Sequence, residues 1–300
     1  MGVYNQWDEE ALFAAVRSVL EQSCRDFEFI IWDDGSDPKA AECLKKLPSL
    51  DPRIHLAGRD RNHGLAFSLN ECIKLAKGKY IARMDADDIS LPQRFEKQLA
   101  FLETHPEYSW CGTAAELFDE DGVWGFRSMP EMPQGKDFYR YSPFIHPSVM
   151  FRAEIFHAER GYPETQETLR CEDYEIFMYL TQKGLKGYNL SEKLFRYRET
   201  RTSYQKRKYR FRINEAKIRY RNYKKMGLLF PFGWLCVLRP LAAGLLPSFV
   251  IAAMKRSEGK RRKAAADAKA ADQAVRGTEG RSLEQGREVQ GAYRVLPERS

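Results

Sequence analysis

The sequence predicts an α/β fold with a mostly parallel central sheet and helices on both faces. Apolar, β-prone runs alternate with amphipathic helical segments up to about residue 103, an order typical of parallel sheets covered on both sides. Polar residues follow these runs, and such sheets bind ligands at the carboxyl ends of their strands. A basic and then apolar segment begins at residue 201, after the alternation has ended. The fold prediction therefore concerns residues 1–200.

The first elements are predicted from apolar spacing and turn residues. Asp8 is a suitable N-cap for a helix that extends to about residue 22. The apolar residues 27–32 predict a strand, and residues 33–38 (DDGSDP) predict a sharp turn into a second helix. Residues 53–57 predict the next strand. A turn at residues 62–64 (NHG) then leads into a helix.

An acidic cluster follows the strand that Tyr80 and Ile81 begin. Asp85, Asp87 and Asp88 lie within four residues, and a helix from Pro92 to about residue 103 comes next. Carboxylates this close repel one another, so a cation or a donor-rich ligand is expected among them. The alternative is a solvated acidic loop in which Asp88 or Ser90 caps the next helix.

The pattern changes after Pro106. Residues 108–118 and 123–126 are predicted to be extended around a turn at 119–122, a helix begins at residue 172, and residues 194–198 predict a closing strand. We expect three regions: a catalytic domain over 1–200, a basic helix and apolar membrane-associating segment over 201–256, and a disordered tail over 257–300.

Several motifs occur together in one order. They are residues 2–5 (GVYN), 27–37 (FEFIIWDDGSD), Asn62 with Gly64 and Asn70, 78–98 (GKYIARMDADDISLPQRFEKQ), 146–152 (HPSVMFR) and 171–177 (CEDYEIF). In this combination the chain resembles a family 2 glycosyltransferase with the GT-A fold, over about residues 2–200. The resemblance implies an inverting enzyme that uses nucleotide-diphospho-sugars.

The resemblance also implies a donor site with a divalent cation. Asp87 matches the ligand of Mn²⁺ or Mg²⁺, Asp85 matches a residue directed to the ribose or the metal, and Asp88 supports them. Breaking the sugar–diphosphate bond puts charge on the leaving phosphate, which a hard cation held by carboxylates would neutralise.

Four further residues match the family's nucleotide-binding positions. Asp34 would accept hydrogen bonds from the base, which favours uracil and hence UDP. Val3 belongs to the GVYN motif, and Asn62 belongs to the turn at residues 62–64. Tyr4 would lie along the nucleotide; as an alternative it is an ordinary core aromatic.

The acceptor hydroxyl needs a general base, and the pair Glu172 and Asp173 matches the family's position for it. We assign the base to Asp173. The alternative is that both acids only stabilise a helix N-terminus. His146 could approach the diphosphate, but we favour a hydrogen-bonded turn histidine.

One departure from the family concerns the start of the sheet. The family has an apolar strand before the GVYN turn, and this sequence begins inside the turn, so the first strand is apparently missing. A sheet without that strand would leave its neighbours exposed. We therefore expect the true start to lie upstream.

Charge and hydropathy indicate a membrane surface as one partner. The net charge is +7, and its excess lies in the second half, where Glu215 is the one acid between Arg201 and Lys225. Prolines and Arg239 divide the apolar residues 227–254 into two pieces that suit interfacial attachment. The alternatives are a single span and an amphipathic helix pair buried within the domain. Without a secretory signal and with scattered cysteines, we expect a cytoplasmic protein, peripheral or monotopic on the inner face of the cell membrane.

The functional prediction is a metal-dependent glycosyltransferase that moves a sugar from a nucleotide-sugar donor to a lipid-linked or saccharide acceptor in cell-surface polysaccharide synthesis. We expect a UDP-sugar as the donor, with another nucleotide sugar as the alternative. The rivals are an inactive GT-A-like membrane-docking protein and a sugar nucleotidyltransferase. The latter needs a Gly-rich phosphate loop that residues 2–7 do not contain. Nucleic acid is not expected as a partner, because the basic run leads into an apolar segment.

Overall fold

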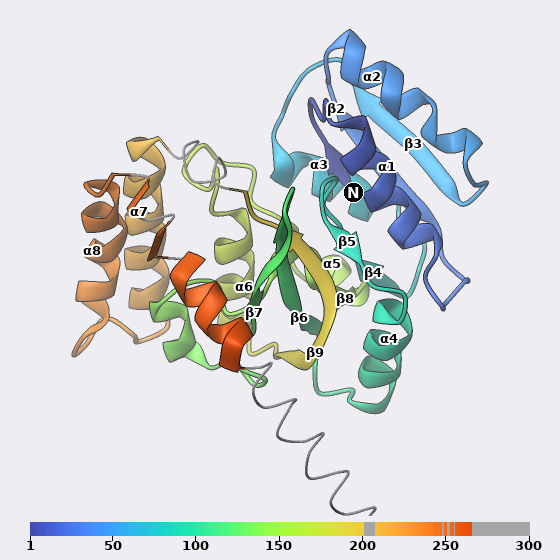
Figure 1. Ribbon diagram of the computed structural model, residues 1–300. Helices are drawn as coiled ribbons and strands as arrows, with labels where there is room; N and C mark the ends of the chain where they lie inside the picture. The colour runs from blue at the N-terminus through green and yellow to red at the C-terminus, as the bar shows by residue number, and fades with distance from the viewer. Residues whose placement is uncertain (201–207, 248, 251–252, 255, 266–300) are drawn as a thin grey trace, which may run out of the picture.

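The computed structural model describes residues 1–200, 208–247, 249–250, 253–254 and 256–265 (Figure 1). The strands are β1 (Gly2–Val3), β2 (Phe29–Asp34), β3 (Ile54–Arg59), β4 (Tyr80–Ala82), β5 (Ile89–Ser90), β6 (Trp110–Asp119), β7 (Gly122–Arg127), β8 (Met150–Arg152) and β9 (Gly187–Arg198). The helices are α1 (Glu9–Leu20), α2 (Pro38–Lys45), α3 (Leu65–Leu75), α4 (Arg94–Thr104), α5 (Glu154–Ala158), α6 (Glu172–Gln182), α7 (Tyr209–Lys225) and α8 (Gly233–Gly244). Short 3₁₀ turns occupy Leu47–Ser49, Gly135–Tyr139 and His146–Ser148.

The strands form two sheets, and the expectation of a mostly parallel sheet is wrong. The first sheet, in the order β1-β2-β3, is entirely parallel. The second, in the order β4-β8-β6-β9-β5 with β7 on β6, is mixed, and its one parallel pair is β6 with β9. The reason is the connections: helical crossovers join β1 to β3, whereas a tight turn at residues 120–121 joins β6 to β7 and forces antiparallel pairing.

The parallel sheet carries helices on both faces, as the alternation predicted. Ile31 of β2 packs in a hydrophobic cluster with Leu12 and Val16 of α1. On the opposite face Trp32 contacts Phe67 of α3. Alternate side chains of one strand therefore reach helices on two sides.

The first strand is short. Gly2 and Val3 form β1, which pairs with Trp32 and Asp33 of β2. The Met1 amino group donates to the Ile30 carbonyl over 2.7 Å, and Met1 itself is buried. Met1, which precedes the GVYN turn, therefore continues the hydrogen bonding between β1 and β2. An upstream extension remains a prediction.

The second hydrophobic cluster joins the mixed sheet to the C-terminal helices. It contains Trp110 of β6, Phe177 of α6 and two fully buried residues of α7, Ile218 and Tyr223. The Asn222 side chain donates to Glu175 Oε2 over 2.6 Å. Consequently α7 is packed into the same core as the mixed sheet, and the boundary predicted at residue 200 passes through one cluster.

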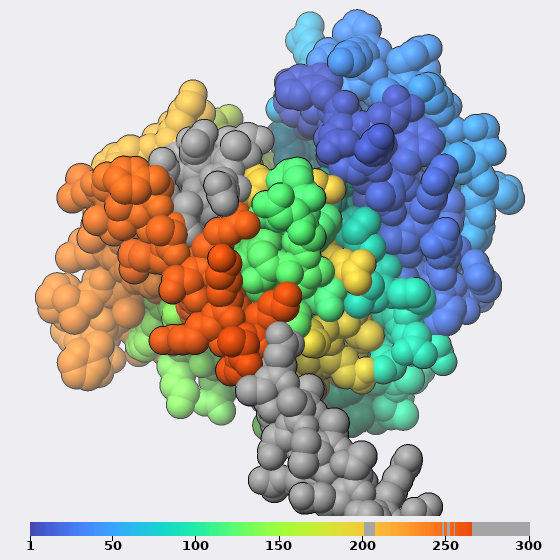
Figure 2. Space-filling model, in the orientation of Figure 1, coloured from blue at the N-terminus to red at the C-terminus, as the bar shows by residue number. Residues whose placement is uncertain are grey.

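The C-terminal segments flank the mixed sheet (Figures 1 and 2). The predicted basic helix corresponds to α7, and α8 lies along it, within the predicted apolar segment. Residues 256–265 are helical and return to the β6–β7 hairpin, where Arg256 pairs with Asp119 at 2.6 Å. The rest of the predicted tail, residues 266–300, lies outside the described residues, as do residues 201–207 of the basic run. Among the residues described, no helix combines the length and apolar character of a membrane span.

Candidate active site

The loops that follow β1 and β2 are bound to each other. The Asn5 N–H donates to Ser36 Oγ over 3.0 Å, and the Asp37 N–H donates back to Asn5 Oδ1 over 2.8 Å. Val3 is buried beneath this pair of loops, whereas the Tyr4 side chain is 52% exposed. Tyr4 is thus not an ordinary core aromatic, and it is available to a ligand at this edge of the sheet.

Asp34 is buried and holds the loop at residues 62–64. Its carboxylate accepts from Asn62 Nδ2 at 2.8 Å, from the His63 N–H at 3.0 and 3.1 Å, and from the Gly64 N–H at 2.7 Å. Burial raises the pKa of Asp34, and the bonds from His63 and Gly64 oppose that rise. The structure therefore brings Asp34 and Asn62 together, as partners of each other.

The three aspartates after β4 form a compact acidic cluster. One carboxylate oxygen from each of Asp85, Asp87 and Asp88 lies within 4.8 Å of the others. Asp88 is 1% exposed; its Oδ1 accepts from the Arg198 N–H at 2.7 Å, while its Oδ2 is buried without a hydrogen-bond partner. A buried carboxylate oxygen left unpaired is costly, so this donor set fits a hard divalent cation.

Burial and mutual repulsion shift the titration of this acidic cluster. Burial, followed by the charge of Asp85, raises the pKa of Asp87 to about 6. The same two causes raise the pKa of Asp88 well above its usual value. Asp85 is held differently, by an ion pair of 2.5 Å with Nη1 of the buried Arg83. The three carboxylates thus differ in environment, and Arg83 compensates only part of their charge.

Arg94 supports the acidic cluster from behind and was not predicted from the sequence. It is fully buried on α4, and its Nη2 donates to the Arg83 carbonyl over 2.8 Å. Its Nε donates to Gln98 Oε1 over 3.0 Å. A signal was present: Arg94 and Gln98 occupy the same helical face as Phe95 and Leu102, which is the face that packs inward. Polar residues at buried positions need polar partners.

A tyrosine missed by the sequence reasoning connects the acidic cluster to the start of α6. Burial raises the pKa of Tyr162, with Arg83 opposing and the charges of Asp173 and Asp85 adding to it, so these groups lie near one another. The Tyr162 hydroxyl lies 2.7 Å from His146 Nε2. Asn70 of α3 fixes the Tyr162 backbone, accepting from its N–H and donating to its carbonyl, both at 2.8 Å.

His146 is buried in the turn His146–Ser148, and burial lowers its pKa well below the usual value. The interpretation of His146 as a hydrogen-bonded turn histidine is confirmed. The lowered pKa favours a neutral ring, whose Nε2 is engaged by the Tyr162 hydroxyl.

Glu172 and Asp173 occupy the first turn of α6, which Cys171 precedes. Glu172 is buried, and burial raises its pKa, while Asp173 is partly exposed. Of the two, Asp173 is the one whose charge reaches Tyr162. Glu172 is therefore in the protein interior, whereas Asp173 is partly open to solvent in the first turn of α6.

The predicted site residues fall into two groups. Asp85 and Asp87 belong to the acidic cluster, and the charges of Asp85 and Asp173 both act on Tyr162. The Gln6 side chain donates to the Ala86 carbonyl over 3.4 Å, which joins the β1 loop to this group. Asp34 and Asn62 form the second group, at the ends of β2 and β3. Arg198 was also missed: its Nε donates to the Asp87 carbonyl over 3.1 Å from the end of β9, a contact between residues far apart in sequence.

Sequence comparisons agree on one family. The family model described as "Glycosyl transferase family 2" matches residues 1–160. The Bacillus subtilis (strain 168) protein EpsE, which is named as a glycosyltransferase, is 35% identical over 252 residues, covering 84% of this chain and 90% of EpsE. The O-antigen biosynthesis glycosyltransferase WbnJ of Escherichia coli is 32% identical over 199 residues, covering 64% of this chain and 76% of WbnJ.

Two solved structures share the fold. S. aureus TarS 1–349 in complex with UDP has a TM-score of 0.57 at 17% identity, covering 81% of this chain and 69% of that one. The mannosyltransferase from Pyrobaculum calidifontis in complex with GDP-Man and Mn²⁺ has a TM-score of 0.54 at 16% identity, covering 85% and 78%. At this identity the likeness concerns the fold, which is GT-A-like.

Proposed function

The chain belongs to glycosyltransferase family 2, and we propose that it transfers a sugar from a UDP-sugar, with inversion, to a lipid-linked or saccharide acceptor of a cell-surface polysaccharide. The observation that carries the proposal is the acidic cluster, whose three carboxylates each place an oxygen within 4.8 Å of the others and include the buried, unpaired Oδ2 of Asp88. The name of WbnJ supports the acceptor class.

The donor half of the site uses the acidic cluster and the β1 and β2 loops. Asp87 and Asp85, with Asp88, would hold Mn²⁺ or Mg²⁺, which when bound would neutralise the diphosphate. Tyr4 would lie along the nucleotide, and the buried Val3 would support the β1 loop from beneath. Asp34 would act on the nucleotide through the loop at residues 62–64 that it holds. The UDP in TarS and the GDP-Man in the mannosyltransferase make these two nucleotides the ones to compare.

The acceptor half of the site depends on α6. In the proposed reaction the acceptor oxygen bonds to the anomeric carbon while its proton passes to Asp173. The bond from that carbon to the diphosphate breaks on the opposite face, and the nucleoside diphosphate leaves. Glu172, buried beside Asp173, would set the position of the first turn of α6. Tyr162, whose hydroxyl is bound to His146, would lie within reach of the charges of Asp173 and Asp85.

The first test measures nucleotide binding by calorimetry, with UDP and with GDP, in the presence and absence of Mn²⁺. We expect UDP binding that needs the metal and that Asp87→Ala abolishes. Asp121→Ala, in the exposed β6–β7 turn, is the matched control and should bind as the wild type does. Binding of neither nucleotide would support the inactive docking protein, and release of pyrophosphate from a nucleoside triphosphate would support the nucleotidyltransferase.

The same assay separates the base from the donor site. Asp173→Asn should bind UDP as tightly as the wild type while its sugar transfer falls by about two to four orders of magnitude, the range for losing a general base. Transfer that survives in Asp173→Asn would remove Asp173 from the mechanism.

A further inference from the structure

The outer side of α8 and the chain before and after it expose an apolar face. We define this apolar face as Phe230, Phe232, Trp234, Leu235, Leu238 and Leu245. Phe230 is 81% exposed and Leu245 is 78% exposed, and Trp234, Leu235 and Leu238 are each 49% exposed. The spacing of these last three along α8 places them on one side of the helix.

The inner side of α8 is already occupied. Cys236 and Val237 pack against the second hydrophobic cluster, and α8 lies along α7. The outer side carries large apolar groups where a solvent-exposed helix would carry polar ones. Of the seventeen large hydrophobic side chains exposed among the described residues, nine lie between Phe230 and Met254, so the exposure is concentrated here and is not scattered over the surface.

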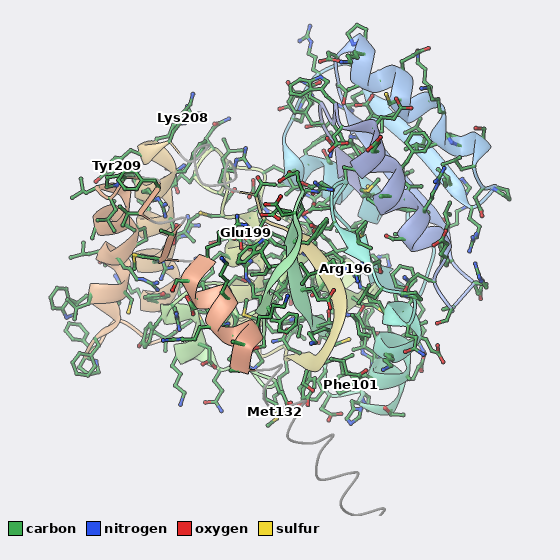
Figure 3. All side chains as sticks on the ribbon, viewed as in Figure 1. Phe101, Met132, Arg196, Glu199, Lys208 and Tyr209 are labelled. Carbon is green, nitrogen blue, oxygen red and sulfur yellow. The ribbon has the colours of Figure 1, made fainter. Side chains whose placement is uncertain are left out.

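The apolar face lies within a strongly basic part of the chain. From residue 208 to residue 263 the sequence has fifteen Lys and Arg against two acids, Glu215 and Glu258. Lys224 and Lys225, at the end of α7 and just before Phe230, are exposed, and so is Arg239 beside Leu238. Figure 3 shows Lys208 and Tyr209 at the edge of the α7–α8 pair, so a basic and an aromatic side chain lie together where α7 begins.

We propose that this apolar face inserts into the interfacial layer of an anionic lipid membrane. Aromatic and aliphatic groups would enter the acyl boundary, while Lys224, Lys225 and Arg239 remain among the anionic headgroups. A second copy of the chain fits less well, because it would bring one basic segment against another. A shallow docking also suits α8, whose twelve residues, Gly233–Gly244, are too few to cross a bilayer.

The proposal does not depend on the donor or on the catalytic base. It adds the location of the reaction: a chain docked by α8 would present its candidate active site to acceptors at the membrane surface. Tyr139, in the turn Gly135–Tyr139, links residues 1–200 to the C-terminal helices. Its hydroxyl donates to the Leu228 carbonyl over 2.7 Å, and its carbonyl accepts from Arg219 of α7 over 2.8 Å.

The test is co-sedimentation of the full chain with vesicles. Vesicles that contain phosphatidylglycerol should retain the protein, and vesicles of phosphatidylcholine alone should retain it at least tenfold less well. Trp234→Gln with Leu238→Gln should lower retention at least tenfold, as should Lys224→Gln with Lys225→Gln. The control pair Leu50→Gln with Leu75→Gln, exposed apolar residues far from α8 in the sequence, should change nothing.

A second measurement guards against variants that fail to fold. Brominated phosphatidylglycerol should quench tryptophan fluorescence of the wild type, and Trp234→Phe should bind vesicles normally but lose most of that quenching. Trp7→Phe, at an exposed tryptophan outside this face, should keep the quenching. The proposal is overturned by equal retention on both vesicle types, by quenching that survives in Trp234→Phe, or by a dimer in sedimentation equilibrium that the Trp234 and Leu238 substitutions dissociate.

Discussion

At the residue scale, a carboxylate such as Asp34 can serve a proposed nucleotide site in two ways: it can hold a binding loop, or it can contact the ligand. Both of its oxygens accept from the loop at residues 62–64, so the carboxylate is engaged by the protein itself. A residue that holds a binding loop and a residue that contacts the ligand respond differently to a conservative substitution, because only the first supports the fold.

Asp34→Asn should lower the free energy of unfolding by about 1–3 kcal/mol, since an amide can satisfy only some of the donors that face it. UDP affinity should fall with it. Urea unfolding and calorimetry measure the two effects, and Asp33→Asn, which would disturb one bond of 2.9 Å from the Ser36 N–H, should destabilise less. A variant of normal stability that no longer binds UDP would instead indicate direct contact with the base.

Glu172 should make stability depend on pH. Burial raises its pKa above the usual 4.5, so the folded state binds this proton more tightly than the unfolded chain does. As pH rises through and above 4.5, ionisation of Glu172 therefore lowers the free energy of unfolding. Glu172→Gln should be stabilising at pH 7.5 and should lose that advantage at pH 4. Urea unfolding at the two pH values checks this; an equal gain at both would exclude the ionisation of Glu172 as the cause.

At the element scale, the turn from β2 into α2 depends on a glycine. Gly35 has φ of +72°, and a Cβ on it would lie 2.6 Å from backbone atoms of Arg61. This close approach places the β2 turn beside the loop that Asp34 holds. The glycine is therefore needed both for its conformation and for the space it leaves.

Gly35→Ala should destabilise the protein by about 2–4 kcal/mol, combining the cost of a left-handed residue with that of the clash. Gly122→Ala is a matched control: Gly122 also has a positive φ, +105°, but a Cβ there would meet nothing within 4 Å. Its cost should be about 1–2 kcal/mol, that of the left-handed conformation alone. Urea unfolding of both variants measures the difference, and equal losses would show that the approach to Arg61 carries no cost.

At the scale of the whole molecule, α7 completes the core of the mixed sheet. Tyr223 is fully buried, and its hydroxyl lies 2.8 Å from that of Tyr174 on α6. Arg219, also buried, donates to the Tyr139 carbonyl. A helix expected to serve membrane attachment thus also covers the core of the mixed sheet, and the proposed membrane contact would use another side of the α7–α8 pair.

A chain that ends at residue 200 should be less stable than one that ends at residue 265 by several kcal/mol. Removing the buried ring of Tyr223 alone costs about 3–5 kcal/mol, a large part of the ~5–15 kcal/mol that holds a domain folded. Urea unfolding and solubility compare the two chains. Coincident unfolding curves would show that residues 1–200 fold independently of α7.

Caps and clusters could be predicted from the sequence where the interacting residues are near one another in sequence. Asp8 caps α1, accepting from the Ala11 N–H at 2.9 Å, and the acidic cluster was found from three aspartates within four residues. Arg198 was missed because its partner, Asp87, is distant in sequence. Tyr162 was missed because a tyrosine paired with a histidine forms no recognisable sequence motif. The sheet was misjudged because strand direction depends on connections, which apolar runs do not encode.

The sequence by itself determined the family, the order of most elements and the aspartates that define the site, since periodicity, turn residues and motif spacing are local properties. Only the tertiary structure decided that Asp34 holds a loop, that Arg94 bonds the Arg83 carbonyl, that Tyr162 bonds His146, and that the second sheet is mixed. These outcomes depend on which groups are buried together, and burial is settled when distant segments pack.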